Sequence, residues 1–374
     1  MIKKHHITAL LAFAWAAIFG VVASLDFAAM HKSEEIFPSP ALTKVGHLSD
    51  YFEPIRGSEG DVEVYYFDSG VPGGTALILG GTHPNEAASN IAATLIAENI
   101  GVTTGRVLVV LRACNSGATC TDPFEAYPQF FTIKNRNGKD RKFRFGSRVA
   151  NPLHQWPDPL VYTHFPSGQR LSGFESRNLN RSYPGRPDGT FTEKIGYAIM
   201  QMIEQENIDI SFDLHEAAPE IPIINAIVYH EKGEDIALNA VLELEMMGLN
   251  YSPELSPDNF RGLSHREWGD RSRTIPFLME VSNPIQGRLR GKTNADLITK
   301  GVSNSYKLAL ESGALRIEYD PEGEPLDRRV ARHVQGIITL IEAYNVDHKK
   351  KAIRLVNLPD YHDIVDNGIG FYLH

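Results

Sequence analysis

The sequence has little cysteine, no excess of positive charge and only one long apolar run. Its 374 residues include two cysteines, Cys114 and Cys120, whereas a structural zinc knuckle needs four ligands. The net charge is -9, from 37 Lys and Arg against 46 Asp and Glu. This balance does not supply the basic face that nucleic acids require, so we expect no nucleic-acid partner. The hydrophobic fraction of 42% is ordinary for a globular protein with a sizeable core.

The single long apolar run lies at the N-terminus. Lys3 and Lys4 precede residues 7–25, which carry no charge. A basic start followed by an apolar stretch predicts a signal peptide, with cleavage after Ala23, but 19 residues also approach the length of a membrane span. We therefore expect residues 1–25 to be a signal peptide or a membrane anchor, with 7–25 as the tether. Either alternative places the rest of the chain outside the cytoplasm, in the periplasm or anchored and facing outward.

The two cysteines are six residues apart, with Gly117 between them. An exported compartment permits disulfides, and this spacing could close a small loop. We expect a Cys114–Cys120 disulfide, the alternative being two unpaired buried thiols.

The pattern of apolar residues divides the chain into a lead-in and one catalytic domain. Residues 26–60 are polar and irregular and are interpreted as a linker, and residues 61–374 as the domain. Strands are expected at 62–67, 75–79, 106–111, 208–214, 221–229 and 275–281, and helices at 86–100, 192–205, 235–247, 294–312 and 327–344. Alternating strands and helices predict an α/β sheet covered on both faces. The long stretch 114–190 shows no periodicity, which is typical of functional loops.

Two segments offer metal ligands. In Gly80-Gly81-Thr82-His83-Pro84-Asn85-Glu86, a turn between a strand and a helix could bring His83 and Glu86 together. The apolar strand that ends in Asp213-Leu214-His215 delivers a third candidate. Two His and one Glu with a fourth position open to water form the ligand set of a catalytic zinc site. Alternatively, Glu86 only favours the helix dipole and His215 only ends a strand.

Two further segments suit the handling of a substrate. Arg177, Asn178, Asn180 and Arg181 lie within five residues, and an Arg fork pairs with a carboxylate through two bonds. The alternative is a solvated loop. Glu280 interrupts an apolar strand, a costly position for a carboxylate unless it is paired or functional. We expect Glu280 to be the general base, ahead of Glu216 and Glu267, because an apolar setting would raise its pKa.

Together these segments resemble the succinylglutamate desuccinylase/aspartoacylase family of the zinc carboxypeptidase superfamily. The family pattern Gly-Gly-x-His-x-x-Glu is matched by residues 80–86, and Asp-Leu-Asn-Arg-x-Phe-Pro-Gly by residues 178–185. The family's Asp-Leu-His strand end matches 213–215, and its late-strand Glu matches Glu280. The sequence departs from the family at Pro84, where Gly is common, and at Asn178, which replaces Asp. We expect neither departure to touch a metal ligand.

The resemblance implies a mixed, mostly parallel sheet between helices and one Zn²⁺ held by His83, Glu86 and His215. It implies that Asn180 and Arg181, with Arg177 beside them, grip a substrate carboxylate and that Glu280 acts as general base and acid. It also implies an oxyanion-stabilising Arg, for which Arg177, Arg112 and Arg266 are the candidates. The expected activity is cleavage of an amide bond beside a carboxylate in an N-acyl amino acid. The alternatives are an exported carboxypeptidase acting on short peptides, such as cell-wall peptides, and a zinc-containing carboxylate-binding protein without catalysis.

Overall fold

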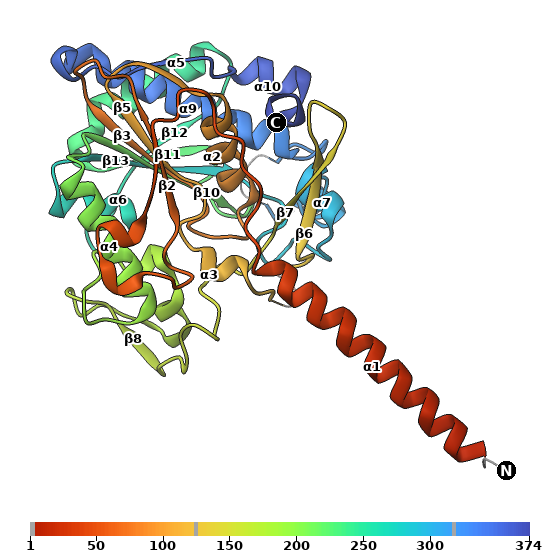
Figure 1. Cartoon of the computed structure of the whole chain (residues 1–374). Coiled ribbons are helices and arrows are strands. Elements are labelled where there is room, and N and C mark those ends of the chain that lie inside the picture. Colours follow the sequence, from red (N-terminus) through yellow and green to blue (C-terminus); the bar gives the residue numbers. More distant parts are fainter. Residues whose placement is uncertain (1–3, 123–125, 316–318) are drawn as a thin grey trace.

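A long N-terminal helix stands apart from the body of the molecule. The computed structural model describes residues 4–122, 126–315 and 319–374; Lys3, part of the predicted basic start, lies outside these ranges. Helix α1 (Lys4–Met30) projects from the body (Figure 1). It is long and apolar enough to cross a membrane, and its most apolar window is 0% buried. These properties are compatible with either a signal peptide or a membrane anchor.

The body is built on one eight-stranded sheet. Its centre is four parallel strands, in the order β5, β3, β10 and β13, and antiparallel pairs join β2 to β5 and β11 to β13. The strands in spatial order are β1 (Lys44–His47), β2 (Glu63–Asp68), β5 (Arg106–Val110), β3 (Thr75–Leu79), β10 (Ile210–Ala217), β13 (Ile275–Ser282), β11 (Ala226–Tyr229) and β12 (Ser252–Leu255). The predicted α/β class with a mixed, mostly parallel sheet is confirmed.

Helices cover both faces of this sheet (Figure 1). Side chains that alternate along a strand enter different cores: Ile78 packs in the larger cluster and Leu77 in the smaller one. The larger cluster includes residues of α2 (Ala87–Asn99), α5 (Glu234–Met246), α9 (Leu326–Asp347) and α10 (Tyr361–Asn367). The smaller cluster includes residues of α4 (Phe191–Gln205) and Trp268 of α6 (Ser264–Arg271). Both β3 and β10 are buried on both faces, and β3 is accordingly an almost continuous apolar run, whereas β10 also carries the buried polar residues Asp213, His215 and Glu216.

Two stretches expected to be irregular contain regular structure. Within 26–60, β1 extends the sheet beside β2. The stretch 114–190 holds a helical turn, two hairpins and two 3-10 helices; these elements are α3 (Asn115–Ala118), β6 (Phe130–Lys134), β7 (Asp140–Arg144), β8 (Val161–Thr163), β9 (Arg170–Ser172), η3 (Gly173–Arg177) and η4 (Leu179–Arg181). These elements are three to five residues long, which is too short for an apolar period to show in the sequence.

The helix expected over 294–312 is two helices, α7 (Ala295–Lys300) and α8 (Asn304–Glu311). Gly301 ends α7 in a left-handed conformation with φ of 66°, and an added Cβ would lie 1.9 Å from the Glu324 carbonyl oxygen. A glycine in this conformation is a common helix C-terminus. Ser303 then caps α8 through a hydrogen bond from the Tyr306 amide. A short antiparallel pair, β4 (Gly101–Thr104) and β14 (Arg354–Val356), completes the described strands.

The disulfide prediction is wrong for this structure, in which both cysteines are free thiols. Cys114 is buried directly before α3, and the Cys120 thiol donates to the Gly117 carbonyl at 3.6 Å. The intervening helical turn gives the two sulfur atoms different surroundings instead of closing a loop through them.

Candidate metal centre

The predicted site residues meet where three neighbouring parallel strands end. In the register of the sheet, Leu79 of β3 lies beside Asp213 of β10, and His215 lies beside Glu280 of β13. Gly81 follows β3 with φ of 64° and packs against the Arg112 backbone, so the chain turns sharply toward α2. Ligand sites in open α/β sheets form at the carboxyl ends of strands, and this cluster has that position.

His83, Glu86 and His215 are buried and point at one another. One ligand atom from each lies within 4.8 Å of the other two. His83 Nδ1 is 2.8 Å from Glu86 Oε1 and 3.1 Å from His215 Nδ1, which lies 3.0 Å from Glu86 Oε2. Three side chains predicted from two separate segments are therefore brought to one point.

The opposite edge of each imidazole faces an oxygen acceptor. His83 Nε2 lies 2.9 Å from Asn178 Oδ1, and His215 Nε2 lies 2.9 Å from Asp213 Oδ2. Because β10 continues to Ala217, Asp213 and His215 share one face of the strand. The expectation that Asn178 touches no ligand is wrong, since the 3-10 turn at η4 carries it to His83. The hydrogen bond to Asn178 fixes the proton of His83 on Nε2 and turns its Nδ1 lone pair inward, whereas Asp213 lies at ion-pair distance from His215 Nε2 without forming a hydrogen bond.

This arrangement fits a divalent cation. Two Nδ1 lone pairs and a carboxylate facing one another repel unless a positive charge lies among them. Burial and the charge of Arg148 lower the pKa of His83 to about 4, so this ring is neutral as a ligand must be. Burial opposes protonation of His215, but Asp213 and Glu86 raise its pKa to about 10. Without a metal ion, a proton on His215 therefore balances the negative charge of Glu86. A divalent cation bound among the three side chains would take over this role.

Glu280 and His83 line one cavity of about 540 Å³. Glu280 Oε2 is buried and has no hydrogen-bond partner within the described part of the chain. Burial raises the pKa of Glu280, and the charge of Glu86 raises it further against the lowering effect of His215. The two rival bases are engaged: Glu216 accepts from Arg329 Nη1 at 2.6 Å, and Glu267 accepts from Arg261 Nε at 2.8 Å. Glu280 therefore differs from its rivals in having a buried oxygen left unsatisfied.

Asn180 and Arg181 also line this cavity. The η4 turn holds them: Asn180 Oδ1 accepts from the Ser264 amide at 2.8 Å, and Arg181 Nη1 donates to the Asn180 carbonyl at 2.7 Å. The Arg181 guanidinium lies 4.7 Å from the centre of the Phe260 ring. Burial and the nearby Arg148 lower the pKa of Arg181 to about 10, so it stays charged at neutral pH. Its placement suits the binding of an anion.

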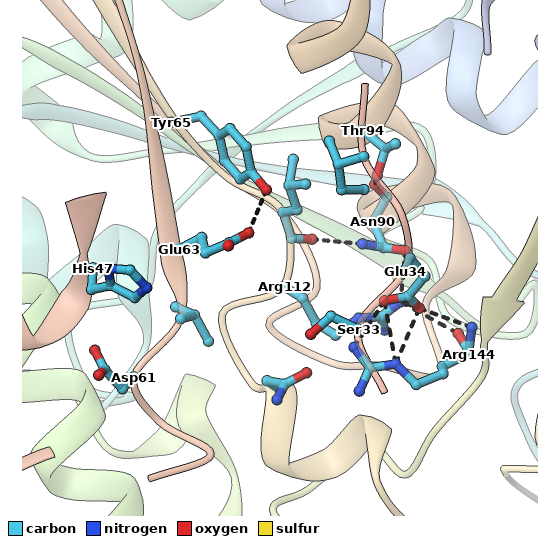
Figure 2. A pocket seen from close by; sticks show the side chains of 14 residues that line it. Ser33, Glu34, His47, Asp61, Glu63, Tyr65, Asn90, Thr94, Arg112 and Arg144 are labelled. Carbon is cyan, nitrogen blue, oxygen red and sulfur yellow. Dashed lines mark hydrogen bonds and ion pairs between the residues drawn. The ribbon is translucent and has the colours of Figure 1, made fainter. Parts of the chain in front are cut away.

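The three arginines considered for the oxyanion lie elsewhere, since the described residues that line the cavity include none of them. Arg177 binds Asp158 through Nε and Nη2 and donates to the Ala150 carbonyl. Arg266 pairs with Glu231. Arg112 lines a separate cavity, where its Nη2 donates to Glu34 at 2.7 Å (Figure 2). Each of the three has acidic partners that fix it away from the cavity at Glu280.

Two cavity residues were missed from the sequence. Arg148 donates through Nη1 to Glu86 Oε1 at 2.8 Å, and its side chain is 30% exposed, so it stands at the boundary of ligand cluster and cavity. His265 of α6 is buried, and neither ring nitrogen has a partner within the described ranges. Arg148 lies in a loop with no periodic pattern, and His265 precedes the more conspicuous Arg266. A buried ring without partners on a cavity wall remains available to a polar group of a ligand.

Comparison with known proteins found limited sequence similarity. No family model matches the sequence. A segment of 64 residues is 38% identical to the N-alpha-acetyl-L-2,4-diaminobutyric acid deacetylase of Halomonas elongata. This segment covers 17% of the chain and 18% of that enzyme, so the match spans less than a fifth of the curated relative.

Solved structures with a similar course of chain come from two groups. A succinylglutamate desuccinylase of Silicibacter sp. TM1040 is 16% identical, with a TM-score of 0.41, over 84% of this chain and 71% of its own. A metallo-carboxypeptidase of Burkholderia cenocepacia is 10% identical, with a TM-score of 0.45, over 87% of this chain and 68% of its own. The structural neighbours are therefore proteins of the succinylglutamate desuccinylase/aspartoacylase family and metallocarboxypeptidases, the groups that the sequence motifs resemble.

Proposed function

We propose that this chain is a zinc-dependent hydrolase that cleaves an amide bond next to a carboxylate, with N-acyl amino acids as substrates. The observation that carries the proposal is Glu280, a buried carboxylate with an unsatisfied oxygen, on the wall of a cavity that His83 also lines. An unsatisfied buried carboxylate is costly, and a role in catalysis accounts for it. The local similarity to a deacetylase supports the same reaction class.

His83 and His215 would hold the zinc through Nδ1, and Glu86 through its carboxylate, with Asn178 and Asp213 fixing the two rings. When bound, zinc supplies a Lewis acid that polarises a carbonyl and makes water a better nucleophile near neutral pH. The residues of the chain then have to orient the substrate and move protons around that centre.

The proton-moving group is Glu280. In its ionised form Oε2 takes a proton from the attacking water and then gives it to the nitrogen of the leaving amine. Burial raises the pKa of Glu280 to about 8, and a pKa within about one unit of neutral pH suits both transfers. Arg148 takes the role expected of Arg177, Arg112 or Arg266, because it lines the cavity and borders Glu86. Its guanidinium would donate to the carbonyl oxygen as negative charge develops there.

Substrate recognition is assigned to Asn180 and Arg181. The Arg181 fork binds the substrate carboxylate, and Asn180, fixed by the Ser264 amide, adds a side-chain amide beside it. Apolar side chains line the same cavity, among them Ile221, Val228 and Leu278. A cavity of 540 Å³ falls within the range of about 300–1,000 Å³ that holds small molecules. Its size favours an acyl amino acid over a long peptide.

The site of action is proposed to be outside the cytoplasm. Helix α1 is long and apolar enough for a signal peptide or membrane anchor, and Lys4 at its start places the positive end inside. Residues 7–25 would tether the chain if they are not removed.

Turnover by Glu280→Gln, with zinc content measured on the same samples, tests the proposal. The variant removes the proton acceptor and keeps the shape, so kcat should fall about 10²–10⁴-fold while about one catalytic zinc remains. Glu216→Gln is the matched control, because Glu216 lines the same cavity but is engaged by Arg329. Full turnover by Glu280→Gln with zinc bound would show that Glu280 is not the base.

The substrate class is tested with a panel of N-acyl amino acids beside short peptides. Product from the acyl amino acids alone supports the proposal. Product from peptides alone would identify a carboxypeptidase. Tight binding of acyl amino acids without product would identify a non-catalytic binding protein.

A further inference from the structure

A second group of metal-preferring side chains lies away from the catalytic cavity. His31, Glu59 and His154 each offer one ligand atom, and these atoms lie within 4.8 Å of one another. The three residues come from the end of α1 and from two loops of the body, and all are half-buried. The described residues that line the cavity at Glu280 do not include any of them.

The outer edge of each imidazole is already held. His31 Nδ1 lies 2.9 Å from the Phe27 carbonyl, one helical turn back, and His154 Nδ1 lies 2.7 Å from Ser116 Oγ. When Nδ1 donates to these oxygens, the other ring nitrogen, Nε2, keeps a lone pair that can bind a metal ion. A second imidazole nitrogen bonded to a carbonyl or hydroxyl is the usual setting of a metal-binding His.

The carboxylate of the group is also oriented by the protein. Glu59 Oε2 accepts a hydrogen bond from Asn115 Nδ2 at 2.5 Å, which leaves Oε1 for a ligand. Two imidazoles and one carboxylate, with outer partners on all three, form a ligand set that suits zinc.

We propose that His31, Glu59 and His154 bind a second divalent metal ion of the zinc type, which fastens the end of α1 to the body. The segment that follows His31 already contacts the body, because Glu34 forms ion pairs with Arg112 and Arg144 (Figure 2). Asn115, which orients Glu59, lines the same cavity as Glu34. The metal ion would add a bond one turn nearer to the helix and fix its direction. Cleavage after Ala23 would leave His31 in place, so the site serves a tethered or a processed chain.

Zinc counting on the purified full chain tests this site. After dialysis against low free zinc, the wild type should hold about two zinc ions, and His31→Ala and His154→Ala about one each. Both variants should keep hydrolase activity, whereas His215→Ala should keep about one zinc ion and lose activity. The control is His362→Ala, an exposed histidine on α10, which should keep about two. About one zinc in the wild type, unchanged in His31→Ala and His154→Ala, would overturn the proposal.

Trypsin cleavage after Lys32 gives a second readout that does not depend on activity. Lys32 is exposed and adjoins His31, so zinc bound at His31 should slow cleavage of this bond at least several-fold in the wild type. In His31→Ala the rate should be the same with and without zinc, whatever its basal value. If zinc slowed cleavage equally in the wild type and in His31→Ala, the slowing would arise from zinc at the catalytic site. That result would refute the proposed metal site at His31, Glu59 and His154.

Discussion

Asn178→Ala should weaken zinc binding although Asn178 is not a ligand. Its Oδ1 lies 2.9 Å from His83 Nε2 and also accepts from the Asn180 amide at 3.0 Å. Both His83 and Asn178 are buried, so water cannot readily replace the lost acceptor. The variant therefore leaves a buried ring N–H unsatisfied and frees the ring to shift its proton to Nδ1.

The size of the effect follows from these contacts. Leaving a buried donor without its partner costs about 1–3 kcal/mol, and loss of an outer partner of a metal ligand typically lowers metal affinity about 10- to 100-fold. That range is about 1.4–2.7 kcal/mol, so the two figures agree. Because Asn178 also caps η4, the variant should lose about 1 kcal/mol of stability without metal.

Competition with a chromophoric chelator measures the zinc affinity, and urea unfolding of the metal-free protein measures the loss of the cap. Asn178→Asp is the matched variant, since its carboxylate restores an acceptor for His83. It should bind zinc at least as tightly as the wild type. Unchanged zinc affinity in a folded Asn178→Ala would refute the assignment of His83 Nδ1 as the ligand atom.

Three further predictions concern stability and recognition. Arg177→Ala should lower the free energy of unfolding by about 1–3 kcal/mol and leave KM unchanged, because it removes the partner of the partly buried Asp158 carboxylate. Arg181→Ala should instead raise KM, so urea unfolding and steady-state kinetics distinguish the two variants. Burial would raise the pKa of Glu34, but Arg112 and Arg144 hold it at about 2, below its ordinary 4.5, so Glu34 stabilises the fold above about pH 4.5 and this stabilisation is lost as the pH falls toward 2. Urea unfolding from about pH 6 to about pH 3 should therefore show a fall in the free energy of unfolding, and Glu34→Gln should reduce that fall. Gly301→Ala should lower the free energy of unfolding by more than about 1–2 kcal/mol, since the added Cβ would clash with the Glu324 carbonyl. Gly313→Ala is the control: it is also at positive φ but faces open space, so it should lose only the cost of the left-handed conformation, and urea unfolding of both variants compares them.

The sheet could be predicted because buried parallel strands leave a strong signal. Thr75–Leu79 and Arg106–Val110 are short runs buried almost throughout, and the chain turns at glycines beside them. The hairpins and 3-10 turns between residues 114 and 190 left no such signal, because elements of three to five residues are too short to show an apolar period. Within an otherwise helical pattern, the sequence did not indicate that Gly301 takes a left-handed conformation and lies so close to the Glu324 backbone that a side chain would not fit.

The candidate ligands could be predicted because they follow strands, whose ends converge in any parallel sheet. Arg148 could not, since only the folded loop brings it to Glu86. Arg177 was misplaced for a similar reason: its neighbour Arg181 enters the cavity, while the η3 helix turns Arg177 toward Asp158. Residue type and spacing therefore identified the groups held by regular strands, and they failed for groups whose direction depends on a loop.

The two outer acceptors differ in charge, and this difference bears on the metal centre. His215 faces the carboxylate of Asp213, whereas His83 faces the neutral amide of Asn178. Arg148 also withdraws negative charge by donating to Glu86.

The donor set thus carries less negative charge than one with an aspartate at position 178. A bound cation would then be held less tightly but would keep more of its charge for polarising a substrate carbonyl. Asn178→Asp should therefore separate the two effects, with tighter zinc binding and a lower kcat measured on the same protein.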